Sequence, residues 1–197
     1  MLIIGLTGTI ASGKSTIADV MRRRHIPIFD ADKTVHKLMD PKGKAVGAVV
    51  AEFGESVLSF GGIDRKALGA LVFGNEAALR RLESILHPQV AEERMRFIKQ
   101  ARMMRRSAVV LDVPLLFETG TDDLCDVTMM AWAPLRLIQQ RALVRPHMTA
   151  TKLAAVLAKQ MPQFEKLILA DEKIATGLGY AAMTRQIHRL LWKWQLR

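Results

Sequence analysis

Four residues near the start of the chain have the types and spacing of a phosphate-binding loop. Gly8, Gly13, Lys14 and Ser15 match the pattern G-x-x-x-x-G-K-[ST]. In such a loop the glycines let the backbone turn tightly, so that several N–H groups point inward at a phosphate. Lys14 would add a charge that reaches the β- and γ-phosphates, and the Ser15 hydroxyl would ligate Mg²⁺. We therefore interpret the motif as a nucleoside-triphosphate site.

The segments on either side of the motif are those that its chemistry requires. An apolar run over residues 2–6 predicts a buried strand before the loop, and an amphipathic segment from about Lys14 predicts a helix after it. The N-terminus of that helix would present its positive dipole end to the same phosphate. We expect the triphosphate to be bound by the residues at the end of the loop and the start of the helix: Ala11, Ser12, Gly13, Lys14, Ser15 and Thr16.

Carboxylates follow two other predicted strands. Residues 25–29 predict a short strand that leads into Asp30 and Asp32, and residues 108–113 predict a strand that carries Asp112. Carboxylates at strand ends lie where α/β sheets bind ligands. Asp32 is equally placed to cap the helix predicted from residue 33 onward. Asp112 is a candidate for ordering Mg²⁺ beside the phosphate loop.

Composition limits the class of protein. With 197 residues, half of them hydrophobic, the chain predicts one α/β domain with insert or lid segments. Its net charge of +10 favours polyanionic partners, either phosphorylated small molecules or nucleic acid. The single cysteine, Cys125, excludes an intramolecular disulfide and is expected to be buried and inert. We expect no cleavable signal, no membrane association and a cytoplasmic location.

The middle of the chain predicts a helical insertion between the second and third strands. Apolar residues recur at helical spacing through most of residues 41–106, and Pro41 and Pro88 each predict the start of a helix. Asp64 predicts an N-cap. No Gly/Ser linker flanks the region, so it should pack against the core.

The last third of the chain predicts two more strands and a basic segment. Residues 125–131 and 173–176 predict the strands. Residues 141–166 predict a helical segment that carries Arg141 and Arg145. Two interpretations remain open for it: a mobile lid that brings cations over the triphosphate, or a solvated surface hairpin.

Several further motifs occur in order along the chain and together resemble one family. They are Asp30-Ala31-Asp32 with His36, Asp64-Arg65 with Leu71-Val72-Phe73, Leu86-His87-Pro88, Asp112-Val113-Pro114-Leu115-Leu116-Phe117-Glu118, Arg141, Arg145, Gln160 and Ala170-Asp171. With the phosphate loop, they resemble dephospho-coenzyme A kinase over essentially the whole chain. The loop is generic, whereas Asp-Ala-Asp, His-Pro and Pro-Leu-Leu-Phe-Glu at these separations are specific.

The resemblance implies a phosphate-loop kinase that uses ATP and Mg²⁺ to phosphorylate the ribose 3′-hydroxyl of dephospho-coenzyme A. It implies a five-stranded parallel sheet flanked by helices, with a helical substrate-binding insertion and a lid. The implied boundaries are residues 1–32, 107–140 and 167–197 for the nucleotide-binding core, 33–106 for the coenzyme A region, and 141–166 for the lid.

The resemblance also implies roles for individual residues. Asp32 would face the acceptor hydroxyl as a base or orienting group, and Lys14 and Arg145 would neutralise the transferring phosphoryl. Arg141 would join the ATP site, and Ser15 and Asp112 would hold the metal ion. The implied substrate-binding residues are Asp32, His36, Leu71, His87 and Leu116.

Four positions depart from the family pattern. Thr9 and Ala11 stand where the family usually has glycine, and Ala11 at positive φ would store about 1 kcal/mol of strain. Pro146 stands where a small polar residue is usual and would stiffen the lid. Thr176 replaces an asparagine near the adenine and would loosen base recognition. No departure removes a charged group that the chemistry needs.

Two alternative functions can be distinguished from dephospho-coenzyme A phosphorylation, one by an assay and one by features of the sequence. The first alternative is another small-molecule or nucleoside kinase of the same fold, and an assay of several acceptors with ATP would distinguish it. A basic nucleic-acid-binding NTPase or a switch GTPase would also use the positive charge. The sequence has no Asn-Lys-x-Asp for guanine recognition, and Trp132, Trp192 and Trp194 are better explained as packing residues than as base-stacking ones. No nucleic-acid partner is expected.

Overall fold

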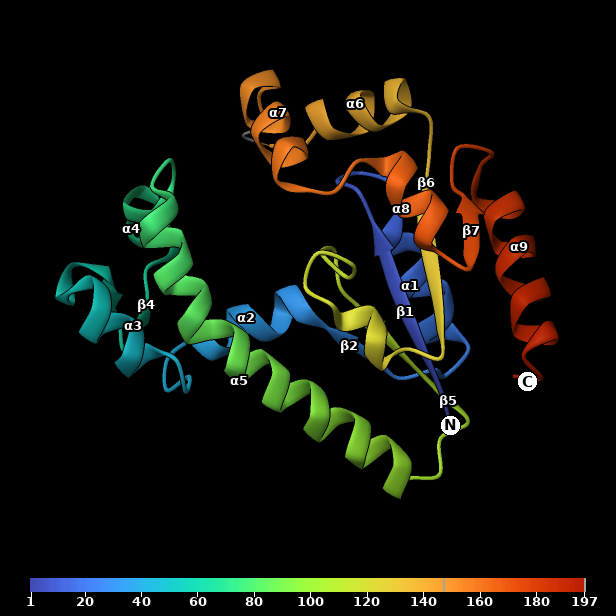
Figure 1. Ribbon diagram of the computed structural model, residues 1–197, viewed down its shortest axis with the longest axis horizontal. Helices are drawn as coiled ribbons and strands as arrows, with labels where there is room; N and C mark the ends of the chain where they lie inside the picture. The colour runs from blue at the N-terminus through green and yellow to red at the C-terminus, as the bar shows by residue number, and fades with distance from the viewer. Residues whose placement is uncertain (147, 197) are drawn as a thin grey trace. The chain divides into compact units, whose positions relative to one another are not determined.

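A computed structural model describes residues 1–146 and 148–196, and within them a parallel sheet of five strands forms the centre of the fold (Figure 1). Its strands are β1 (Leu2–Gly8), β2 (Ile28–Asp30), β5 (Ala108–Asp112), β6 (Val127–Trp132) and β7 (Glu172–Ala175). Their order in the sheet is β2-β5-β1-β6-β7. The predicted five-stranded parallel sheet is confirmed.

The register of the sheet places the functional motifs at one edge. β1 pairs with β5 as far as Leu6 opposite Asp112, and with β6 as far as Gly8 opposite Ala131. β1 is buried from its second residue onward, as expected of a central parallel strand covered on both faces. Because parallel strands end at the same edge, the phosphate loop and Asp112 emerge side by side.

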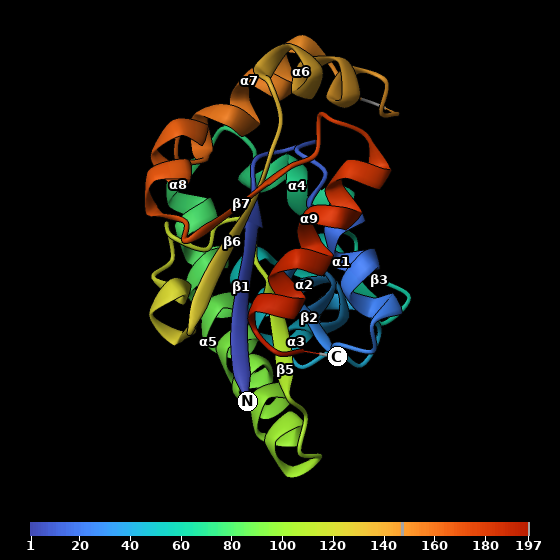
Figure 2. The ribbon, with the colours of Figure 1, turned by 90° about the vertical axis from the view of Figure 1, so that its right-hand side faces the viewer.

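Two compact units make up the chain: residues 1–29 with 101–197, and residues 30–100. The helices of the first unit are α1 (Lys14–Arg23), α6 (Leu135–Leu143), α7 (Ala150–Lys159), α8 (Gln163–Leu169) and α9 (Tyr180–Lys193), with a 3₁₀ turn, η2, at Thr121–Leu124. Figure 2 shows α1 and α9 side by side on one face of the sheet, with α8 on the opposite side against β6. Apolar residues of α1 and α9, among them Ile17, Met21 and Ile187, pack with Ile4 and Leu6 of β1.

The second unit is mainly helical. It contains α2 (Ala31–Met39), α3 (Val46–Phe53), α4 (Arg65–Val72) and most of α5 (Glu76–Met103), together with a 3₁₀ turn, η1 (Glu55–Val57), and a hairpin of β3 (Leu58–Ser59) and β4 (Gly62–Ile63). Its core is made of apolar side chains from each of these helices, including Leu38, Val49, Leu68, Leu82 and Leu86. The predicted N-cap is confirmed, because the Asp64 carboxylate accepts from Lys66 N at 2.8 Å and from Ala67 N at 3.2 Å.

Three sequence-based expectations for the second unit are wrong. Pro41 does not open a helix, since the chain turns from Asp40 and helix α3 begins only at Val46. Pro88 does not start a new helix but lies inside α5. The buried side chains of α5 before and after Pro88 explain its continuity, because one unbroken helix keeps all of them packed: Leu82, Leu86 and Ile98.

The third error concerns the hairpin at residues 58–63, which the helical interpretation of the region missed. Its turn holds Phe60 at φ 48° and Gly61 at φ 80°. Two successive residues at positive φ are typical of the tight turns that join antiparallel strands. The Gly61-Gly62 pair was the signal in the sequence that could have indicated it.

No helix in the described parts of the chain is long and apolar enough to cross a bilayer. Cys125 is half-buried rather than buried, and its sulfur lies 3.5 Å from the Thr121 carbonyl oxygen.

Candidate active site

The phosphate loop has the strongly turned backbone that its sequence predicts. Ala11 has φ 58° and Gly13, which precedes α1, has φ 94°. Ser12 N donates to Thr9 O at 3.1 Å and closes the first turn. Turns of this kind leave successive N–H groups on one side of the loop, where they form an anion-binding nest. The conditional expectation about Ala11 is met, and its left-handed backbone costs about 1 kcal/mol.

Replacing Ala11 by glycine is expected to leave kcat unchanged or slightly raised. Glycine relieves the strain of the left-handed backbone, which stabilises the loop. It also removes a methyl group that packs with Ala133 and Ile138, which destabilises the loop, so the two effects on stability oppose each other. Steady-state kinetics and thermal unfolding provide the measurements. Ala18→Gly, inside α1, is the matched control and should lower stability by about 1 kcal/mol, because its backbone is already helical. A large activity loss in Ala11→Gly would show that the methyl group holds the loop in its working shape.

Lys14 and Asp112 meet at the mouth of this loop. The Lys14 ammonium donates to the Asp112 carboxylate, with side chains 16% and 6% exposed. Asp112 is the last residue of β5 and Lys14 the first of α1, so the strand-end geometry brings the two predicted residues together. Ser15 and Thr16 are exposed in the first helical turn. Lysine charge, helix N-terminus and carboxylate therefore converge on one place, as triphosphate chemistry requires.

Thr176 links the phosphate loop, at Ser12, to Arg141. The Thr176 hydroxyl is buried, donates to Ser12 O at 2.5 Å and accepts from Arg141 at 3.1 Å. Arg141 also donates to the Thr176 carbonyl at 2.9 Å. A Cβ atom on Gly13 would lie 3.0 Å from the Thr176 side chain, so the loop approaches Thr176 as closely as glycine allows. Sequence reasoning linked Thr176 only to the adenine and missed this tether.

Arg145 lies outside the helix that carries Arg141. Helix α6 ends at Leu143, and the expected continuation of the helix through Arg145 is wrong. Pro146 explains the end of the helix, because a residue before proline is disfavoured in the α conformation. The Arg145 side chain is exposed and forms no ion pair with any residue in the described ranges. Its guanidinium is thus accessible to a ligand.

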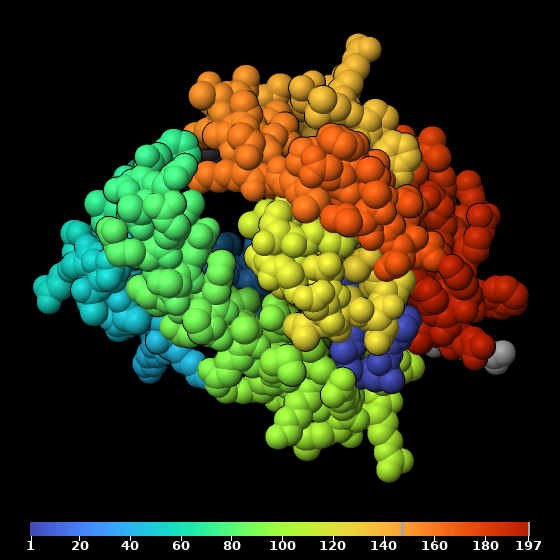
Figure 3. Space-filling model, in the orientation of Figure 1, coloured from blue at the N-terminus to red at the C-terminus, as the bar shows by residue number. Residues whose placement is uncertain are grey.

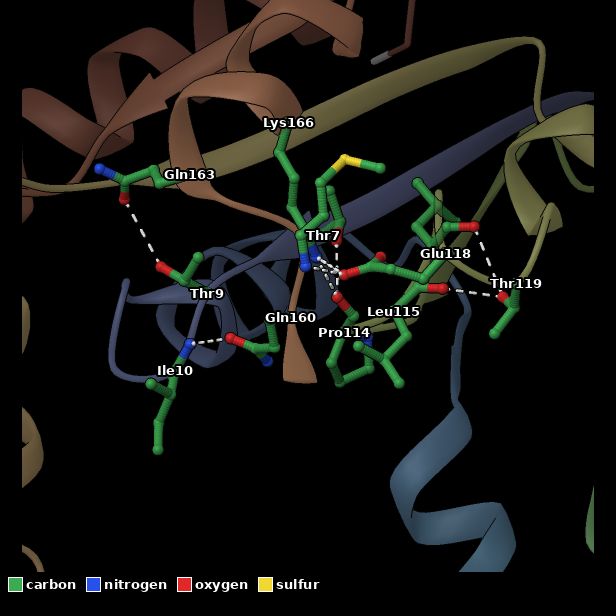
Figure 4. A network of polar contacts seen from close by, with 12 residues as sticks. Thr7, Thr9, Ile10, Pro114, Leu115, Glu118, Thr119, Gln160, Gln163 and Lys166 are labelled. Atoms are coloured by element: carbon green, nitrogen blue, oxygen red, sulfur yellow. Dashed lines mark hydrogen bonds and ion pairs between the residues drawn. The ribbon is translucent and has the colours of Figure 1, made fainter. Parts of the chain in front are cut away.

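A second polar network, shown in Figure 4, lies beside the loop. Gln160 Oε1 accepts from Ile10 N at 3.1 Å, and Lys166 Nζ lies 2.8 Å from both Glu118 Oε1 and Pro114 O. Lys166 is the last residue of the segment expected to form a mobile lid or a solvated surface hairpin, yet its side chain is completely buried. The family motifs that contain Gln160 and Glu118 were the signal that these residues matter.

The residues expected to bind the second substrate differ in exposure. Asp32 is exposed in the first turn of α2, and the N-cap is Asp30, whose carboxylate accepts from Lys33 N at 3.0 Å. The alternative that Asp32 is the cap is therefore wrong. His36, Leu71 and His87 are also exposed.

Leu116 does not fit the substrate-binding expectation. Its side chain is completely buried, and its methyl groups lie 2.9 and 3.4 Å from where a Cβ atom on Gly5 would be. Leu116 thus packs beneath β1 and is a core residue. The apolar Pro-Leu-Leu-Phe sequence of this loop is explained by that packing.

Comparison with known proteins decides the family. The dephospho-CoA kinase family model matches residues 2–178. The chain belongs to the dephospho-CoA kinase family. A dephospho-CoA kinase from Rhodospirillum rubrum is 50% identical over 178 residues, which cover 90% of this chain and 84% of that protein. A dephospho-CoA kinase from Mesorhizobium japonicum is 44% identical over 191 residues, covering 97% of this chain and 95% of that one.

A solved structure shares the fold of the whole chain. The crystal structure of TT1252 from Thermus thermophilus superposes with a TM-score of 0.84 at 29% identity, covering 98% of this chain and 96% of that chain. As a dephospho-CoA kinase, the chain catalyses the ATP-dependent phosphorylation of dephospho-CoA to CoA. The expected activity is confirmed, and the alternative kinase and nucleic-acid-binding functions are not favoured.

Proposed function

We propose that phosphoryl transfer takes place at the phosphate loop, from the γ-phosphate of ATP to the ribose 3′-hydroxyl of dephospho-CoA. The observation that supports this most strongly is the left-handed backbone at Ala11 and Gly13 beside the Lys14–Asp112 pair. Such a loop needs little reorganisation when a phosphate arrives, and preorganised donors are the main source of electrostatic catalysis. The position of the new phosphate in the product, read by ³¹P–¹H correlation NMR, tests the proposal. A phosphate on any other hydroxyl would contradict it.

Lys14 would exchange partners when ATP binds. Its ammonium is neutralised by Asp112 in the structure, and a triphosphate at the loop would attract it through greater negative charge. Asp112 and the Ser15 hydroxyl are oxygen donors of the kind that Mg²⁺ prefers, and no cluster of three His, Cys, Asp or Glu side chains occurs among the described residues. Mg²⁺ is commonly held by one or two protein oxygens plus substrate phosphates, so this donor set fits it. Bound there, Mg²⁺ would neutralise charge on the β- and γ-phosphates.

Asp32 is proposed to orient the acceptor hydroxyl and take its proton. Its carboxylate is exposed and does not cap α2, so it is available to a ligand. We propose that residues 33–106 hold the coenzyme A half, with His36, Leu71 and His87 as contacts. Residues 141–166 are proposed as the lid, which would exclude water so that ATP is not hydrolysed. Because the reaction consumes ATP, we also propose a cytoplasmic location.

Arg145 is expected to act in the transition state rather than in ATP binding. Its exposed guanidinium would meet the charge that develops during transfer, so Arg145→Ala should lower kcat and kcat/KM together by about 10²-fold or more. Arg145→Lys should rescue poorly, because lysine lacks the planar fork that matches phosphate oxygens. Steady-state kinetics with varied ATP provides the measurement.

Arg136 is a matched control for Arg145, since it is exposed near the start of α6. Arg136→Ala should leave both kinetic constants unchanged. Unchanged kcat in Arg145→Ala at saturating ATP would remove Arg145 from the mechanism and make Arg141 the next candidate. A rise in KM alone would assign Arg145 to ATP capture.

A further inference from the structure

The end of α7 and the start of α8 are tied to the phosphate loop and to the end of β6. Gln160 Oε1 accepts from Ile10 N at 3.1 Å, inside the loop. Gln163 Nε2 donates to Ala133 O at 3.1 Å, one residue beyond β6, and its Oε1 lies 3.5 Å from the Thr9 hydroxyl. Both glutamines use side-chain amides on main-chain or hydroxyl groups, so they fix backbone position rather than charge.

Lys166, inside α8, ties that helix to the loop that follows β5. Its Nζ lies 2.8 Å from Pro114 O and 2.8 Å from Glu118 Oε1 (Figure 4). Each of these acceptors also has a second donor: Thr7 Oγ1 reaches Pro114 O at 3.0 Å, and Met161 N reaches Glu118 Oε1 at 2.8 Å. In Figure 3 the orange side chains of α8 lie directly against the yellow segment that contains Glu118. Pro114 O is thus bonded both by β1, through Thr7, and by α8, through Lys166.

We propose that Lys166 is a positioning residue for phosphoryl transfer, whose buried ammonium fixes the main chain just after Asp112 by holding Pro114 O and Glu118. Pro114 is two residues beyond Asp112, and Asp112 in turn holds Lys14. Gln160 holds the phosphate loop through Ile10 N, and Lys166 holds the loop that follows Asp112. Together these contacts keep the phosphate loop and Asp112 in one arrangement. Lys166 has no exposed surface, so it acts through these residues and does not touch ATP.

The electrostatic environment of Lys166 includes two unfavourable factors, burial and the charge of Lys14, and one favourable factor, the contact with Glu118. Burial lowers the pKa of Lys166 below that of an exposed lysine, the hydrogen bond and charge of Glu118 raise it, and the positive charge of Lys14 lowers it. A buried charge is unfavourable unless it is paired and hydrogen-bonded. An apolar side chain would avoid that cost but would leave Pro114 O and Glu118 without this donor.

Lys166→Met tests the proposal, because methionine has a similar length and no charge. We expect kcat to fall by about 100-fold, the size of loss that a displacement of about 1 Å produces in a catalytic arrangement. Equilibrium binding of ATP should weaken by much less than kcat falls. Lys173→Met is the matched control, since Lys173 is an exposed lysine on β7 in the same unit, and it should behave as the wild type.

Glu118→Gln and the double variant Lys166→Met/Glu118→Gln add a readout that simple destabilisation would not produce. If the two residues act through one contact, the double variant should be no slower than the slower single variant. Removing the Glu118 charge lowers the pKa of Lys166 further, so the fall of kcat at alkaline pH should begin at lower pH in Glu118→Gln. In Lys166→Met there is no ammonium to lose its proton, so the part of the alkaline fall in kcat that is caused by Lys166 should be absent.

A folded Lys166→Met variant with kcat within about twofold of the wild type would overturn the proposal. If that variant does not fold, the pH profile of Glu118→Gln decides: a shift to lower pH supports the proposal and an unchanged profile overturns it. The inference rests on the proposed role of the phosphate loop, and Lys14→Ala separates the two. An inactive Lys14→Ala with a fully active Lys166→Met would refute the positioning role alone, whereas a fully active Lys14→Ala would refute the phosphate-loop assignment.

Discussion

Lys14→Ala is expected to lower kcat about 10²–10³-fold, because it removes a preorganised charge from the transferring phosphoryl group. It also leaves the Asp112 carboxylate, only 6% exposed, without its lysine partner. The melting temperature should therefore fall somewhat as well, since a buried carboxylate that loses a cationic partner is less well stabilised. Turnover at saturating substrates, measured together with thermal unfolding, separates the two effects.

The double variant Lys14→Ala/Asp112→Asn is the control for stability. It replaces the buried carboxylate that has lost Lys14 by a neutral amide, so it should regain stability relative to Lys14→Ala without regaining activity. Near-wild-type turnover in a folded Lys14→Ala would contradict the assignment of the phosphate loop itself.

Asp32→Asn is the second change with a large expected effect. A carboxylate that takes the acceptor proton contributes about 10²–10⁴-fold in rate, and asparagine cannot accept that proton. The melting temperature should barely move, because Asp32 is exposed and only loses a favourable interaction with the helix dipole of about 0.3–1 kcal/mol. Single-turnover rates, which isolate the transfer step, provide the measurement.

Asp30→Asn is the matched control for Asp32. Asp30 is the N-cap of α2, and asparagine caps a helix about as well as aspartate. We therefore expect this variant to remain folded and active. If Asp32→Asn keeps full single-turnover rates, Asp32 does not serve as the base and the proton must leave by another route.

The parts of the fold that local sequence determines could be predicted. Residues 2–6 are apolar and the next residues carry the loop motif, so β1, the loop and the start of α1 at Lys14 were all expected. The Asp64 cap was expected for the same reason, because an N-cap depends on its own helix. Pro88 was misjudged because tertiary packing of α5 overrides the local tendency of proline to end a helix.

The missed parts of the site depend on contacts between distant residues. The Thr176 hydroxyl donates to Ser12 O across 164 residues, and Lys166 Nζ donates to Pro114 O across 52 residues. No periodicity or spacing in one sequence reveals such pairs. Leu116 shows the opposite error, since a family motif indicated its importance but its complete burial makes the reason structural.

The central claim is that this chain transfers phosphoryl groups from ATP to dephospho-CoA at the phosphate loop. A coupled assay of ADP release, run with and without dephospho-CoA, tests it most directly. We predict that ADP forms in proportion to the dephospho-CoA consumed, that little ADP forms without the acceptor, and that Lys14→Ala lowers the acceptor-dependent rate about 10²–10³-fold. ADP release at the same rate with and without dephospho-CoA, or acceptor-dependent release at a near-wild-type rate in folded Lys14→Ala, would contradict the account.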